Sequence, residues 1–306
     1  MARSRSPAID NGGFPARDQV LPARSSAPIY KQVIALRASI RDHVHQLVRA
    51  GEMELVRPEG DPGFFGVTSE VWEVHRDFSA MMIGGVAALL TQALHPGALG
   101  GVWDHSSWRK DPHGRLARTA KFIAVTTYGG TAQAEAAIAK VRRIHDRVTG
   151  VLPDGTAYAA NDPKLLTWVH AAEADCFLRA HVAYREPGMS GARQDRYLSE
   201  MAGLARRLGA EGVPETRRAA AAYFREVRPQ LRCDERARAV TAALLAQAEG
   251  VGVAAGVGQV VMRAGVEMMQ PWAAAMHEMN TPAARRPAVR AGALAAAGVL
   301  RWALKG

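Results

Sequence analysis

Apolar residues recur at helical spacing along most of the chain, and this pattern predicts a helical protein. The predicted helices cover residues 29–51, 79–95, 114–125, 131–148, 163–181, 192–208, 214–226, 234–249 and 257–279. No segment shows the convincing alternation of apolar and polar residues that would indicate a strand, and there is no internal repeat. We therefore predict an all-α fold that forms a single helical domain.

Pro96 is expected to end the second of these helices, because a residue that precedes a proline disfavours helical geometry. This expectation places His95 at the C-terminal end of a buried helix. The following residues, 97–112, contain glycine and tryptophan and are expected to form a connection.

Loop and capping residues mark other boundaries. Residues 57–63, with two prolines and two glycines, are expected to form a loop. Thr131 is expected to cap the helix that follows it. Asp162 and Pro163 are expected to open a further helix as its N-cap and first helical residue.

The two ends of the chain differ from its middle. Residues 1–26 are rich in Arg, Ser, Pro and Gly and lack the apolar run of a signal peptide, so a flexible N-terminal arm is expected. Residues 27–285 form the predicted helical domain. Residues 286–306 are expected to form a basic C-terminal tail or terminal helix, whose apolar part at 291–304 either packs on the domain or lies on a membrane surface. No apolar stretch reaches the roughly 18 residues that would predict a transmembrane segment.

The cysteines and the charge limit the compartment and the partners. Cys176 and Cys233 are too few for a disulfide framework, so a cytoplasmic protein is expected. The formal net charge of +10 would suit nucleic acid or an anionic membrane. The arginines are interleaved with Glu and Asp, however, and form no block of five or six. Solvated helix faces explain the charge more simply, and nucleic acid is not expected as a partner.

His145 lies on the apolar stripe of its predicted helix. The stripe steps by 4, 3, 4 and 3 residues through Ala134, Ile138, Val141, His145 and Val148, so the imidazole is expected to point inward. One interpretation is a core histidine that is satisfied by a carbonyl or carboxylate. The other is an axial ligand to heme iron, since a neutral imidazole is a common iron ligand and a porphyrin face needs apolar surroundings.

Arg115, Arg118 and Thr119 are expected to share one side of a helical turn. Two arginines and a hydroxyl can hold heme propionates, orient dioxygen or bond a substrate carbonyl. They are equally compatible with an exposed basic turn.

A second histidine, His170, lies with Glu173 on the stripe of the helix that Asp162 opens. A histidine and carboxylate pair that supports a ligand is one interpretation, and a structural hydrogen bond is the other. The ionisable residues within 72–77 are expected to cap a helix and to form ion pairs, and they are not expected to be catalytic.

Other cofactor patterns are absent from the sequence. There are no paired Glu-x-x-His motifs for a di-iron centre, no strand followed by a glycine-rich nucleotide fingerprint, and no cysteine spacing for zinc.

Six motifs in order between residues 63 and 231 resemble the family that contains latex clearing protein, the rubber oxygenase, and the MpaB-type oxygenases. They are Val71-Trp72-x-Val74-His75-x-Asp77, Gln92-Ala93-Leu94-His95-Pro96, Arg109-x-Asp111-Pro112-x-Gly114-Arg115-Leu116-x-Arg118-Thr119, Thr126-Thr127-Tyr128-Gly129, Val141-Arg142-x-Ile144-His145-x-Arg147-Val148 and Asp162-Pro163-x-Leu165-Leu166-x-Trp168-Val169-His170. The resemblance implies a globin-like helical core around heme b.

The resemblance also implies roles for single residues. His145 matches the proximal iron ligand, and Arg115 and Thr119 match a distal pair that supports activity. Arg118 stands where the rubber-cleaving member has a lysine that can bind the iron, and a guanidinium is a poor iron ligand.

The distal position is therefore expected to be open, water-filled or closed by His95 or His170, and Arg142 is a further candidate for cofactor binding. The family's distal glutamate has no clear match, since Asp104 is the only acid in residues 99–105.

These features together predict a heme-b-dependent oxygenase that uses O2 on a small apolar organic substrate, such as an isoprenoid or another secondary metabolite. The alternative is a helical binding or regulatory protein of basic charge that has no catalytic role.

Overall fold

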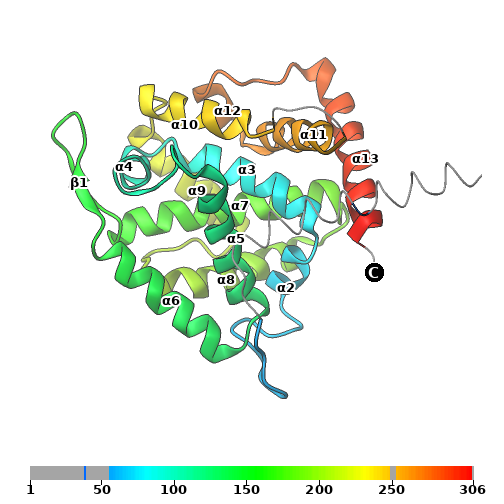
Figure 1. Cartoon of the computed structure of the whole chain (residues 1–306), viewed down its shortest axis with the longest axis horizontal. Coiled ribbons are helices and arrows are strands. Elements are labelled where there is room, and N and C mark those ends of the chain that lie inside the picture. Colours follow the sequence, from blue (N-terminus) through cyan, green and yellow to red (C-terminus); the bar gives the residue numbers. More distant parts are fainter. Residues whose placement is uncertain (1–37, 39–54, 249–252, 305–306) are drawn as a thin grey trace, which may run out of the picture. The chain divides into compact units, whose positions relative to one another are not determined.

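The computed structural model describes residue 38 and residues 55–248 and 253–304 (Figure 1). The predicted arm at 1–26 and, apart from residue 38, the predicted helix at 29–51 lie outside these residues. The helices are α2 (Glu70–His75), α3 (Phe78–Gln92), α4 (Pro96–His105), α5 (Pro112–Tyr128), α6 (Thr131–His145), α7 (Pro163–Tyr184), α8 (Gly191–Leu208), α9 (Arg217–Val227), α10 (Glu235–Ala246), α11 (Val253–Met268), α12 (Pro271–Met276) and α13 (Arg286–Leu304). The predicted all-α class is confirmed.

Short polar side chains begin most of these helices by accepting a hydrogen bond from a backbone N–H of the first turn. The caps are Ser69, Asp77, Asp111, Asp162, Ser190, Thr216 and Asp234. The prediction for Asp162 and Pro163 is confirmed. The prediction for Thr131 is wrong, because Gly130 holds the N-cap position and the Thr131 hydroxyl donates to Asp61 instead.

The segment around Pro96 also differs from the sequence prediction. The preceding helix, α3, ends at Gln92, and Pro96 opens α4 within the stretch that was expected to be a connection. A proline fits the first turn of a helix because its missing N–H has no helical partner there. His95 is consequently the N-cap of α4, and its Nδ1 accepts from the Gly97 N–H at 3.2 Å.

The structure also differs from the sequence prediction at a short hairpin and within one long predicted helix. Strands β1 (Thr149–Val151) and β2 (Ala157–Ala159) form an antiparallel hairpin, and three residues per strand are too few to show alternation. The predicted helix at 257–279 is divided into α11 and α12, since Pro271 starts a new helix.

The core is built on α3, which packs along α7 on one side and α11 on another (Figure 1). Glycines allow both close approaches. A Cβ on Gly84 would lie 2.9 Å from Phe177 Cα, and a Cβ on Gly265 would lie 2.5 Å from Val86 Cγ1. Large buried side chains such as Leu90 fill the remaining space.

His75 joins α2 to two other helices inside a buried region. Its Nδ1 is hydrogen-bonded to Thr127 on α5 at 2.9 Å, and its Nε2 to Tyr197 on α8 at 3.2 Å. Burial, with the nearby His181 as a smaller cause, lowers the pKa of His75 to about 3. The imidazole is therefore neutral in the folded protein at neutral pH.

The terminal helix α13 packs on α11 and α3. Leu300 and Ala303 are buried, and Arg301 donates to the Asp77 carboxylate at 2.7 Å. In the described part of the chain, no single helix has both the length and the hydropathy to cross a bilayer, and only α3 and α4, bent by 103°, meet those criteria as a pair.

We predict that Gly84→Ala destabilises the protein. The added methyl meets the Phe177 backbone at 2.9 Å, and overpacking of this kind costs about 1–3 kcal/mol, more than the gain of about 0.5–1 kcal/mol from replacing a helical glycine. Gly203→Ala in α8 is the matched control, because nothing lies within 4 Å of its Cβ. Urea denaturation should give a lower free energy of unfolding for Gly84→Ala and an equal or higher one for Gly203→Ala. Two variants of equal stability would contradict the close packing.

A second prediction concerns acid. Because the folded pKa of His75 lies below its unfolded value near 6.5, the unfolded chain binds the proton first, and stability falls as the pH drops below about 6.5. This residue should contribute a loss of about 2 kcal/mol between pH 7.5 and pH 5.0. His75→Gln keeps a polar partner for Thr127 but does not titrate, so its loss over the same range should be smaller by that amount. An equal loss in both proteins, measured by urea denaturation, would refute the assignment.

Candidate functional site

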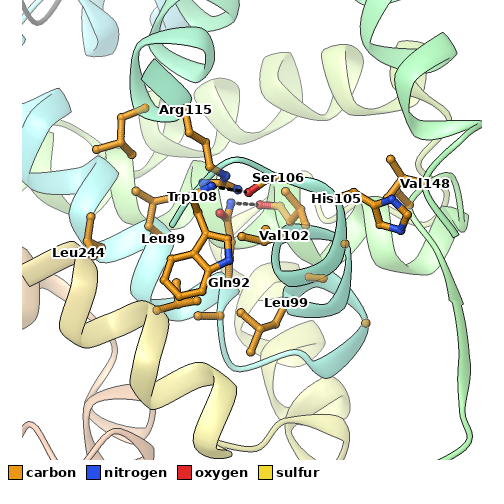
Figure 2. Close-up of a pocket in the computed structure, with 18 of the residues that line it drawn as sticks. Leu89, Gln92, Leu99, Val102, His105, Ser106, Trp108, Arg115, Val148 and Leu244 are labelled. Carbon is orange, nitrogen blue, oxygen red and sulfur yellow. Dashed lines mark hydrogen bonds between the residues drawn. The ribbon is translucent and has the colours of Figure 1, made fainter. Parts of the chain in front are cut away.

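A cavity of about 390 Å³ lies among α3, α4, α5, α6, α7 and α10 (Figure 2). Most of its lining is aliphatic and includes Leu89, Leu99, Val102, Leu116, Val169 and Leu244. The volume is in the range of cavities that enclose small organic ligands. The cavity is therefore the candidate site for a cofactor or substrate.

Three histidines line this cavity: the exposed His105 at the end of α4, and His145 and His170 from two other helices. His145 is the last residue of α6, and His170 lies in α7. Neither ring makes a hydrogen bond with a described residue, and Nδ1 of each is buried. Burial is the main cause that lowers both pKa values, His170 to about 4 with a further contribution from His145. Both imidazoles are thus neutral at pH 7 and can offer a nitrogen lone pair to a metal.

Arg115 reaches the same cavity from α5. Burial and the charge of Arg118 lower its pKa, but a guanidinium remains charged in a protein. No ion pair or hydrogen bond joins its side chain to any residue in the described ranges. A half-buried cation without a carboxylate partner can stabilise an anionic group, or a developing negative charge, inside the cavity.

Arg118 and Thr119 do not line the cavity, although they follow Arg115 on the same helix. Both are exposed. Arg118 pairs with Asp111 at 3.4 Å and donates to Ser107 Oγ at 2.8 Å. The Thr119 hydroxyl donates to the Arg115 backbone carbonyl at 3.4 Å. The structure therefore separates these two residues from the site that Arg115 shares with the histidines.

Three other candidates also lie outside the lining. His95 has its Nδ1 engaged at the start of α4, and its ring lies 6.0 Å from that of Trp168. Arg142 is exposed and borders a different groove. Asp104 is exposed and accepts a 2.7 Å hydrogen bond from the Tyr158 hydroxyl.

No hydrogen bond among the described residues links Glu173 to His170, so the structure does not show the pair that their spacing had raised as one interpretation. Burial raises the pKa of the Glu173 carboxyl to about 7. Its protonation state therefore depends on pH near neutrality.

The structure adds polar residues that sequence reasoning missed. Trp108 lies in the cavity wall beside Arg115, between Leu89 and Leu244 on one side and Leu99 on the other (Figure 2). Its Nε1 is buried without a partner in the described part of the chain, as are Thr241 Oγ1 and Gln247 Oε1 of the α10 wall. Unpaired buried polar atoms are costly, so their concentration around one cavity points to a bound ligand.

The sequence offered little signal for these residues. Trp108 follows α4, in a stretch for which the sequence predicts a connection between helices. Thr241 and Gln247 lie after the last of the six family motifs, which ends at His170. Nothing in the spacing of α10 shows that this helix closes a cavity whose other walls come from helices that precede it by a long stretch of sequence, α3 to α7.

The described residues contain no group of three or more His, Cys, Asp or Glu side chains that could hold a metal ion. Both cysteines are free thiols, and Cys176 is buried. A metal carried by a cofactor needs only one or two protein ligands, and His145 and His170 can provide them.

Comparison with known proteins shows the family to which the chain belongs. Neither the curated proteins nor the solved structures give a match. A family model matches residues 72–302, which extends the similarity from the motif region through α10, α11, α12 and most of α13. The chain belongs to the family of the ER-bound oxygenase mpaB/B' and rubber oxygenase catalytic domain.

Proposed function

We propose that this oxygenase-family protein uses heme b and O2 to oxidise a small apolar organic substrate, of the isoprenoid or secondary-metabolite type. The observation that carries the proposal is the pair of neutral imidazoles, without hydrogen-bond partners among the described residues, in an apolar cavity. The membership of the family supports the oxygenase reaction.

The residues of the cavity fit a heme. Its aliphatic walls suit the faces of a porphyrin, and its histidines suit the iron, which takes four of its ligands from the porphyrin itself. We assign His145 as the iron ligand for two reasons. It lines the cavity, and its sequence motif matches the one that carries the proximal iron ligand in the related oxygenases. Heme iron, when bound, supplies the one-electron and O2 chemistry that amino-acid side chains lack.

The other residues of the cavity have distinct tasks in this proposal. Arg115 donates hydrogen bonds to negative charge that develops during the reaction, and the low polarity of its surroundings strengthens that interaction. The aliphatic walls exclude water and bind the apolar part of the substrate. Arg118 and Thr119, being exposed and outside the cavity lining, do not contact the substrate in this proposal.

The alternative of a helical binding or regulatory protein predicts a protein that purifies without heme. Freshly purified protein should instead contain one heme b per chain, measured by pyridine extraction and the Soret absorption. Absence of heme from protein expressed with an adequate heme supply would favour the alternative.

We predict that His145→Gly removes the normal iron ligand. The glycine leaves room for free imidazole, so added imidazole should restore the wild-type absorption spectrum, as expected when a ligand and not the fold has been lost. His105→Gly is the control, because His105 also lines the cavity but is exposed and hydrogen-bonded to the Thr149 carbonyl at 2.9 Å.

The same imidazole titration applied to His170→Gly distinguishes His145 from His170. If His170→Gly loses the wild-type heme spectrum and imidazole restores it, while His145→Gly keeps that spectrum, His170 would be the iron ligand in place of His145. Unchanged heme in both variants would reject the cavity as the heme site.

A further prediction concerns Arg115. If its guanidinium donates to anions in the cavity, Arg115→Ala should retain heme but bind fluoride at the ferric iron roughly 10- to 100-fold more weakly, the range for a lost hydrogen bond to a charged group. Arg118→Ala should change neither the fluoride affinity nor the ferric spectrum, since Arg118 is exposed and paired with Asp111. A spectral titration measures both. Equal effects of the two substitutions would show that only overall charge matters.

A further inference from the structure

The basic motif that surrounds His145 forms a second concave site, which the oxygenase reaction does not use. A groove of about 410 Å³ lies between α6 and α8, which pack side by side (Figure 1). Its charged lining consists of Arg142, Arg143, Arg206, Arg207, Glu135 and Asp146. The groove and the cavity lie on different faces of the last turn of α6, because His145 borders the cavity and its neighbours border the groove.

The arginines of the groove differ in their partners. Arg206 pairs with Glu215, and Arg207 pairs with Glu135. Arg142 and Arg143 make no ion pair or hydrogen bond with any residue within the described ranges, and both are exposed. Two of the four guanidinium groups are thus paired with carboxylates, and the two on α6 keep their full hydrogen-bonding capacity.

Helix ends account for part of this charge but not all of it. Arg142 and Arg143 lie in the last turn of α6, and Arg206 and Arg207 in the last turn of α8. A helix C-terminus carries about half a negative charge, which one cation offsets. The two arginines of α8 are already ion-paired, whereas Arg142 and Arg143 are not, so one of these two exceeds the need of the α6 end.

We propose that this groove binds the phosphate group of an anionic ligand, with Arg142 and Arg143 as the main contacts. A phosphate offers several oxygens in different directions, and guanidinium groups donate to them in pairs, so arginines from two helices can surround it. The Ile138 and Ala139 side of the groove gives a small apolar surface for the carbon part of the ligand. The phosphate belongs either to a soluble phosphate ester or to a phospholipid headgroup.

The test measures phosphate binding by the full-length protein. Isothermal titration with inorganic pyrophosphate at low ionic strength should show binding, and Arg142→Gln with Arg143→Gln should weaken it roughly tenfold or more. The control is Arg218→Gln with Arg225→Gln, which changes the net charge equally on the exposed surface of α9. This control should keep the affinity within about twofold, since it leaves the local contacts intact.

A second arm separates the two sources of phosphate. Sedimentation with phosphatidylglycerol vesicles, compared with phosphatidylcholine vesicles, should depend on Arg142 and Arg143 if the ligand is a headgroup, and should be weak if it is a soluble ester. Selective loss in the α6 variant, in either arm, supports the site. An equal loss of binding in both double variants would show that only the net charge of the protein matters, and would contradict the site. Absence of binding of both pyrophosphate and anionic vesicles by the wild type would also overturn the proposal. Heme content does not enter either measurement, so the result is independent of the proposed oxygenase site.

Discussion

The close packing of α3 against α7 is the constraint on which the candidate site depends. Gly84 lets the α7 backbone approach, and the same two helices then both supply cavity lining, Leu89 and Leu90 from α3 and Val169 and His170 from α7. A wider separation would move the α7 part of the lining, which includes His170, away from the α3 part. The glycine contact therefore sets the position of His170 relative to the α3 wall of the cavity.

Burial also determines the chemistry of the cavity. The aliphatic lining lowers the pKa values of His145 and His170 and so keeps both imidazoles neutral. It also lowers the local dielectric constant around Arg115, which strengthens the electrostatic interactions of the guanidinium. Elsewhere around α6, Arg142 and Arg143 are exposed to water, and their charge is left for ligands from solution. The last turn of α6 thus borders both an apolar cavity and a basic groove. The residues that face each of them suit different ligands.

The sequence predicts the helices well where one face is apolar and the ends are capped, as at Asp162, and it places His145 on the inward stripe that the structure shows. It fails at Pro96, because a proline that ends one helix can equally begin the next. Spacing alone also groups Arg118 and Thr119 with Arg115, whereas packing decides which of the three enters the cavity. Trp108 and Thr241 could not be predicted, since their place in the wall arises from contacts between helices that are distant in sequence.

The central claim is that heme occupies this cavity with His145 on its iron. A crystal structure of the protein purified with its own cofactor tests it most directly. The account predicts a porphyrin between α5, α6 and α7, with a ring nitrogen of His145 bonded to the iron and Arg115 on the cavity wall. A porphyrin bound elsewhere, or iron bonded to His170 while His145 is free, would contradict it.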